Sequence, residues 1–127
     1  MFMKKIVHSE KAPKAVGPYS QAVQTGNMLF VSGQIPMDAE TGKIVEGGIT
    51  EQTHQVLKNM GHILREAGYD YSDVVKCTVL LDNMDNFVPM NEVYGQYFTE
   101  NAPARAAYGV VRLPLGVMVE IECIAAK

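Results

Sequence analysis

The chain has 127 residues, 47% of them hydrophobic and 20% charged, and this composition predicts one globular domain that spans residues 1–127. The net charge of −3, with both signs interspersed, gives no basic surface for nucleic acid or for an anionic membrane. No apolar run approaches the roughly 20 residues of a membrane-spanning helix. Residues 1–5 carry two lysines without a following apolar segment, so we expect no secretory signal and a cytoplasmic protein.

The first third of the chain has the pattern of short strands. Residues 4–8 predict an edge strand, and residues 11–18, rich in Ala, Pro and Gly, predict a loop. Residues 19–25 and 28–34 have strand composition and are joined by Gly26-Asn27, a two-residue link that is typical of a β-hairpin.

Two helices are expected around one strand. Apolar residues between positions 49 and 67 recur with the helical period and predict the first helix. Residues 73–81 form a β-rich, mostly apolar run, which indicates a strand covered on both faces. The second helix is expected over 85–99, with Asp85 as its cap and Pro89 in its first turn.

Two further strands, over 105–112 and 117–125, complete the predicted order. The alternation of elements predicts an α+β domain in which both helices pack on one face of a mixed β-sheet. The strands carry apolar residues on both faces, and one core of this size cannot cover both. We therefore expect the second face of the sheet to be buried by other copies of the chain.

The sequence offers no signature of a metal site, a disulfide or a cofactor. Cys77 and Cys123 lie in apolar strand-like runs and are expected to be core residues in a reducing compartment. His54 and His62 are about 12 Å apart along a helix, too far for ligands of one ion. Phosphate-binding, dinucleotide-binding and nucleophile motifs are absent.

Arg105 is the most informative candidate for a functional residue, because its neighbours from Ala102 to Val111 are otherwise uncharged. A partly buried guanidinium requires an anionic or carbonyl partner, since a desolvated unpaired charge is costly. That partner is either a group of the chain, in a structural ion pair, or a ligand carboxylate or phosphate bound bidentately.

Three other polar residues interrupt apolar or turn patterns. Asn91 lies on the apolar stripe of the second predicted helix and is either a satisfied core amide or a ligand contact. Tyr19 follows Gly17-Pro18 and is either a core tyrosine or a hydrogen-bond donor to a ligand. Ser32-Gly33 closes a strand and is either a turn or an anion contact. No histidine is placed to activate Ser32 as a nucleophile.

Glu120 and Glu122 share one face of the last strand, opposite a fully apolar face. A solvated face accounts for at least one of them. A glutamate that points into an enclosed site could orient a water molecule or act as a general base.

These residues belong to motifs that resemble the RidA (YjgF) family of reactive-intermediate deaminases. The motifs are Gly17-Pro18-Tyr19-Ser20-Gln21-Ala22, Ser32-Gly33-Gln34-Ile35-Pro36, Asn91-Glu92-Val93-Tyr94, Pro103-Ala104-Arg105, Arg112-Leu113-Pro114 and Val119-Glu120-Ile121-Glu122. Each motif alone is weak, but together they follow the family's order and spacing from about Ile6 to Ala126.

The resemblance implies a chorismate-mutase-like α+β fold and a homotrimer with active sites between subunits. It implies cofactor-independent hydrolysis of 2-imino acids, with Arg105 holding the substrate carboxylate and Glu120 orienting water. Family contacts fall on Tyr19, Ser32-Gly33 and Asn91. Ala107 stands where many members have a cysteine, so a role for that position is limited to its backbone.

Two alternatives remain open at this stage. The same pocket could bind a small carboxylate as a regulatory protein without turnover, although such a binder gains nothing from a second negative charge at Glu120. Some members of the family are linked to RNA cleavage or chaperone-like activity, and the net charge of −3 argues against RNA here.

Overall fold

The computed structural model describes residues 3–127, so Met1 and Phe2, which begin the segment screened for a secretory signal, lie outside it. Eight helices and strands follow one another along the chain: β1 (Lys5–Val7), β2 (Ala22–Thr25), β3 (Met28–Gln34), α1 (Ile49–Glu66), β4 (Val74–Leu81), α2 (Phe87–Tyr97), β5 (Ala104–Gly109) and β6 (Val119–Ala126). Short 3-10 turns occur at Tyr71–Asp73, Met84–Asn86 and Pro114–Gly116.

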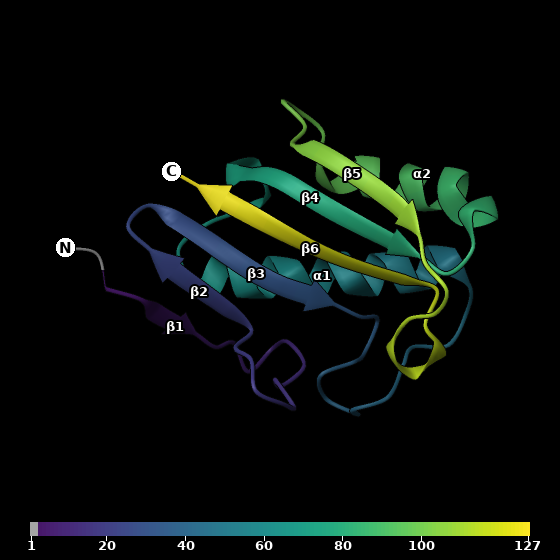
Figure 1. Cartoon of the computed structure of the whole chain (residues 1–127), viewed down its shortest axis with the longest axis horizontal. Helices are drawn as coiled ribbons and strands as arrows, with labels where there is room; N and C mark the ends of the chain where they lie inside the picture. The colour runs from purple at the N-terminus through teal and green to yellow at the C-terminus, as the bar shows by residue number, and fades with distance from the viewer. Residues whose placement is uncertain (1–2) are drawn as a thin grey trace.

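The strands form one six-stranded mixed sheet in the order β1-β2-β3-β6-β4-β5. All neighbouring pairs are antiparallel except β4 and β5, which are parallel and are connected through α2. Figure 1 shows both helices behind the sheet, with its front face free of other elements. This arrangement confirms the predicted α+β fold with two helices on one face of a mixed sheet.

The core lies between the sheet and the two helices. Alternate residues of β6, namely Val119, Ile121, Cys123 and Ala125, are buried against this side. Cys77 of β4 pairs directly with Cys123, and both thiols are buried and free, as predicted. Among the described residues no helix is long and apolar enough to cross a membrane.

None of the described helices or strands covers the opposite face of the sheet, and apolar side chains lie on it. Ile6 of β1, Phe30 of β3 and Tyr108 of β5 are exposed by 53%, 42% and 56%. The prediction that residues 73–81 are covered on both faces is wrong for the single chain, because Thr78 and Leu80 remain only half-buried.

Three element boundaries differ from the sequence-based predictions. The second strand begins at Ala22, which leaves Tyr19 in the preceding loop. Asp85 is not a helix cap: Asn83 accepts the Asp85 backbone N–H at 2.9 Å, and this bond forms a 3-10 turn ahead of α2. The strand that contains Arg105 ends at Gly109 rather than at Arg112.

Gly61 provides a test of the packing inside α1. A Cβ at this buried position would collide with the Tyr71 hydroxyl, which donates to the Leu57 carbonyl at 2.7 Å. Helix propensity alone would favour Gly61→Ala by about 1 kcal/mol. We expect instead that overpacking destabilises the variant by about 1–3 kcal/mol in denaturant unfolding.

The Gly61→Ala change should cost clearly less in a Tyr71→Phe background, because that change removes the colliding oxygen. An equal cost in both backgrounds would show that the Tyr71 hydroxyl is not the group that limits the packing at Gly61.

Candidate active site

Arg105 of β5 is held against α2 by three side chains of that helix. Its Nη1 donates to Asn91 Oδ1 at 2.5 Å. Its guanidinium carbon lies 4.8 Å from the centroid of the Tyr94 ring and 5.5 Å from that of the Phe87 ring. Phe87, Asn91 and Tyr94 are spaced four and three residues apart, so they share one face of the helix. This face fixes the direction of the guanidinium by cation–π contacts and one hydrogen bond.

The guanidinium has no acidic partner among the residues that the structure describes. Among residues 3–127, the ion pairs join His8 to Glu10 and Arg65 to Asp70. Asn91 accepts one N–H of Arg105, and a guanidinium has five. A structural ion pair within the chain therefore does not account for Arg105, and its other donors are free for a carboxylate.

Asn91 is exposed, so the interpretation of Asn91 as a buried core amide is wrong. Its carbonyl oxygen serves Arg105 rather than the helix interior. The helix α2 begins at Phe87, two residues later than predicted, and it buries Met90, Val93 and Tyr94, while Asn91 lies beside this buried face.

Cys77 supplies a thiol close to Arg105, but this thiol is buried. Cys77 of β4 is the register partner of Arg105, and burial raises the pKa of its thiol. Burial also raises the pKa of Tyr94, whose hydroxyl has no hydrogen-bond partner among the described residues. Ala107 pairs with Val79 on the same face as Arg105 and packs against the core. Cys77 therefore does not replace the thiol that Ala107 lacks.

A second group of predicted residues lies on the opposite face of the sheet. Tyr19, Ser32, Gly33 and Glu120 line one open cleft of about 640 Å³, with Glu122 at the same cleft. The cleft lies where the loop before β2 meets the end of β3 and the first half of β6. The structure thus brings together four predicted site residues that are spread along the sequence from position 19 to position 120.

Gly33 is required by the position of the Glu120 carboxylate. A Cβ on Gly33 would collide with Glu120 Oε2 and would lie 2.9 Å from the carboxyl carbon. The register of β3 against β6 shifts between Val31 and Gln34, so Gly33 lies at an irregularity of the ladder. The absence of a side chain at this point lets the carboxylate lie over the backbone of β3.

Ser32 is committed to the chain itself. Its hydroxyl donates to the Ser20 carbonyl at 2.6 Å, and its backbone N–H donates to the Gln21 carbonyl at 2.9 Å. These two bonds tie β3 to the segment that carries Tyr19. The hydroxyl keeps only its acceptor lone pairs for a ligand.

The two groups of residues do not meet within one chain. Arg105, Asn91 and Ala107 lie on the helix side of the sheet or at its β5 edge. Glu120 pairs with Leu80 on the uncovered face, as does Tyr108 of β5. We call these groups the arginine half-site and the glutamate half-site.

Sequence analysis identified Arg105 but missed the aromatic residues that hold it. Phe87 and Tyr94 were not among the predicted site residues. Their spacing with Asn91 is the signal that could have identified a helix face turned toward a ligand-binding arginine. Within residues 3–127, no group of three or more His, Cys, Asp or Glu side chains is arranged to hold a metal ion.

The fold and the two half-sites define an α+β protein whose candidate site residues are divided between the two faces of one sheet. The chain matches the Endoribonuclease L-PSP family over residues 9–127, and it belongs to this family, which includes RidA and YjgF proteins. A RutC family protein of Pyrococcus horikoshii is 55% identical over 125 residues, covering 98% of this chain and 99% of that protein.

Two other relatives carry names that bear on function. A human protein named 2-iminobutanoate/2-iminopropanoate deaminase is 50% identical over 123 residues, covering 97% of this chain and 90% of that protein. The crystal structure of Escherichia coli TdcF with bound serine superposes with a TM-score of 0.93 at 40% identity, covering 97% of this chain and 98% of that one.

The environment of Glu120 predicts an elevated carboxyl pKa. Burial, and then the neighbouring negative charge of Glu122, raise the pKa of Glu120 above 4.5. We expect a carbon-13 NMR titration to give a midpoint above 4.5 for Glu120, and a lower midpoint in the Glu122→Gln variant. An unchanged midpoint in that variant would assign the whole shift to burial.

The same shift has a consequence for stability. The folded chain binds the Glu120 proton more tightly than the unfolded chain does. The stability that this proton provides is present at low pH and is lost as the pH rises from the usual carboxyl range through the raised pKa. Glu120→Gln should remove this component of the pH dependence of unfolding.

Proposed function

We propose that this protein hydrolyses 2-imino acids, such as 2-iminopropanoate and 2-iminobutanoate, to 2-oxo acids and ammonia. The observation that carries the proposal is the Arg105 guanidinium, which is oriented by two aromatic rings and an amide but is without an acidic partner among the described residues. The activity named for the human and Arabidopsis relatives, at 50% and 51% identity, supports the same conclusion.

Arg105 binds the substrate carboxylate in this mechanism. A planar guanidinium pairs with a carboxylate through two parallel hydrogen bonds, which fix the position of the adjacent C=N carbon. Asn91 maintains the orientation of Arg105 through the bond that it already accepts. Tyr19 donates its phenolic hydrogen to the substrate, Ser32 and Gly33 shape the cleft beside it, and Ala107 contributes only backbone.

Glu120 acts on water. Its carboxylate accepts a proton from a water molecule as the water oxygen forms a bond to the imine carbon, and the C=N π electrons move to nitrogen. Glu120 returns this proton to nitrogen, which gives a tetrahedral aminoalcohol. Glu120 then takes the hydroxyl proton and passes it to the amino group, and the C–N bond breaks to release ammonia as the C–O bond becomes the carbonyl of the 2-oxo acid. A raised pKa suits a group that both accepts and returns a proton near neutral pH.

No metal or cofactor is required by this proposal. A free imine already hydrolyses in water, so orientation and proton transfer are sufficient to accelerate the reaction. We assign the reaction to the cytoplasm, where pyridoxal-phosphate dehydratases acting on serine or threonine would release the enamines that tautomerise to these imines.

Each complete site is proposed to form between two subunits of a homotrimer. The arginine half-site and the glutamate half-site lie on different sides of one sheet, so a single chain cannot offer both to one substrate. The uncovered face carries Ile6, Phe30 and Tyr108, whose apolar surface would be buried by neighbouring copies. A closed ring of three copies would pair each arginine half-site with a glutamate half-site of the next subunit.

Substitution of Arg105 tests the carboxylate contact. With a dehydratase supplying the imine, wild-type protein should accelerate the decay of imine absorbance, and Arg105→Ala should lose about 100-fold or more in kcat/KM. Arg105→Lys should retain an intermediate rate, because an ammonium keeps the charge but not the bidentate geometry. Equal decay with wild type and Arg105→Ala would contradict the proposal.

Glu120→Gln separates catalysis from simple binding. This variant should still bind 2-oxobutanoate in calorimetry, since the carboxylate contact is intact, while its imine hydrolysis falls. If wild type binds 2-oxobutanoate but hydrolyses no imine, the chain is instead a regulatory protein that binds small carboxylates. A chaperone-like activity would survive Arg105→Ala.

The shared site predicts complementation between two inactive variants. Arg105→Ala inactivates the arginine half-site and Glu120→Gln inactivates the glutamate half-site, so mixed trimers should contain some intact sites. An equal mixture that is unfolded and refolded together should recover roughly a quarter of the wild-type rate. Each half-site comes from an intact subunit about half of the time, and both must be intact in the same site. Activity no greater than that of the separate variants would show that both half-sites come from one chain.

A further inference from the structure

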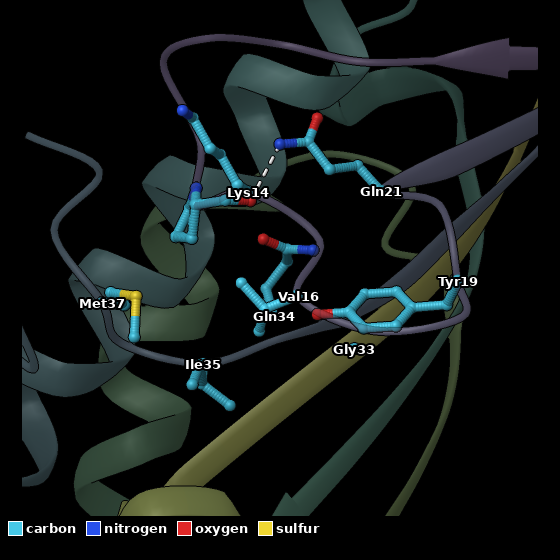
Figure 2. Close-up of a pocket in the computed structure, with 9 residues that line it drawn as sticks. Lys14, Val16, Tyr19, Gln21, Gly33, Gln34, Ile35 and Met37 are labelled. Carbon is cyan, nitrogen blue, oxygen red and sulfur yellow. Dashed lines mark hydrogen bonds between the residues drawn. The ribbon is translucent and has the colours of Figure 1, made fainter. Parts of the chain in front are cut away.

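A small pocket opens from the glutamate half-site. It has a volume of about 90 Å³ and lies between the loop before β2 and the end of β3. Figure 2 shows Tyr19 and Gly33 on one side of it and Met37 on the other. Five residues line both this pocket and the larger cleft that contains Glu120: Val16, Tyr19, Gly33, Ile35 and Met37. A substrate positioned by Glu120 would therefore lie at the mouth of the pocket.

The lining of the pocket is mainly apolar and uncharged. Lys14 is its one ionisable group besides Tyr19, and Lys14 is exposed. Gln34 places a polar side chain in the lining of the pocket, and this residue is only 6% exposed. Its Nε2 donates to the Ser32 carbonyl at 3.0 Å, and its Oε1 accepts no hydrogen bond from the described residues. An uncharged group suits such a pocket, since a charged one would lose its hydration without gaining a counter-ion.

Buried amides fix both walls of the pocket. Gln21, which is 3% exposed, donates to the Pro13 carbonyl at 2.8 Å and so holds the loop wall. Asn59 of α1 is fully buried and donates to the carbonyls of Ile35 and Met37 at 3.1 and 2.9 Å, which holds the opposite wall. A pocket with fixed walls binds its occupant without the entropic cost of ordering them.

We infer that this pocket is the subsite for the side chain of the 2-imino acid, and that it accepts uncharged side chains of up to about four non-hydrogen atoms. The size limit follows from comparison with an apolar cavity of about 150 Å³, which holds the six carbons of benzene. The inference rests on the proposed function, because it assigns the substrate class of the same site.

The test compares imines of different side-chain length. An L-amino-acid oxidase with catalase would generate them from alanine, norvaline and glutamate, and kcat/KM would be measured for each. Wild type should prefer the propyl side chain of the norvaline imine to the methyl of the alanine imine. Two buried methylenes correspond to a preference of about fifteenfold, at about fourfold per methylene. The carboxylate side chain of the glutamate imine should be a poor substrate.

Two variants alter the pocket from opposite directions. Val16→Phe places a ring at its mouth, and the fold should tolerate it because Val16 is 85% exposed. It should abolish most of the norvaline preference, measured as the ratio of the two kcat/KM values within the variant, so that a general loss of rate does not affect the readout. Met37→Ala should enlarge the pocket and raise the relative rate for a phenylalanine-derived imine. The matched control is Val88→Phe, an exposed position on α2 that lines neither the pocket nor the cleft, and it should leave the preference unchanged.

The outcomes separate the two proposals. Substrate preferences that are unchanged in both Val16→Phe and Met37→Ala, with hydrolysis intact, would overturn the side-chain subsite alone. Loss of preference in Val88→Phe as well would overturn it too, because the effect would not be local. Wild-type protein that hydrolyses none of the imines would overturn the proposed function and the subsite together.

Discussion

The two-residue period of the β-strand is the constraint on which the rest of the site depends. Leu80 of β4 pairs with Glu120 on one side and with Tyr108 on the other, so these three side chains share the uncovered face. Arg105 precedes Tyr108 by three positions and must therefore point to the other face. No change of rotamer can bring a guanidinium and a carboxylate together through a sheet, which is why the proposed chemistry calls for a second copy of the chain. The apolar surface of the uncovered face gives that second copy a place to pack.

In the arginine half-site a positive charge is oriented by its neighbours without being neutralised. A carboxylate partner within the chain would hold Arg105 well but would compete with the substrate. The rings of Phe87 and Tyr94 orient the guanidinium without consuming its hydrogen-bond donors, and Asn91 takes only one of them. The attraction of the aromatic faces offsets part of the desolvation cost. The result is a cation that is directed but not neutralised, and most of its binding capacity remains for an anion.

Hydrophobic periodicity predicted most of the fold, because burial on one side is what that periodicity records. It located α1 and the face of β6 that packs against the helices, and the Gly26-Asn27 link marked the hairpin, where Gly26 has φ of 60°. It failed where side-chain hydrogen bonds replace regular structure, as Asn83 does before α2. The site residues were identifiable by type, but their division into two half-sites was not. That division depends on which strands pair with β4 and in which register, and these are long-range facts that local sequence does not encode.

The buried amides Gln21 and Asn59 hold loop backbone in place, and neither is needed to form a strand or a helix. A buried polar side chain is tolerated in a core only when its hydrogen bonds are made, and an apolar residue of similar size would often stabilise the fold as well. Both amides instead bond to backbone carbonyls of irregular segments, one on each side of the pocket beside Tyr19 and Gly33. These segments lack the ladder bonds that fix a strand. The amides therefore give loop backbone the rigidity of regular structure at the point where substrate selectivity would be set.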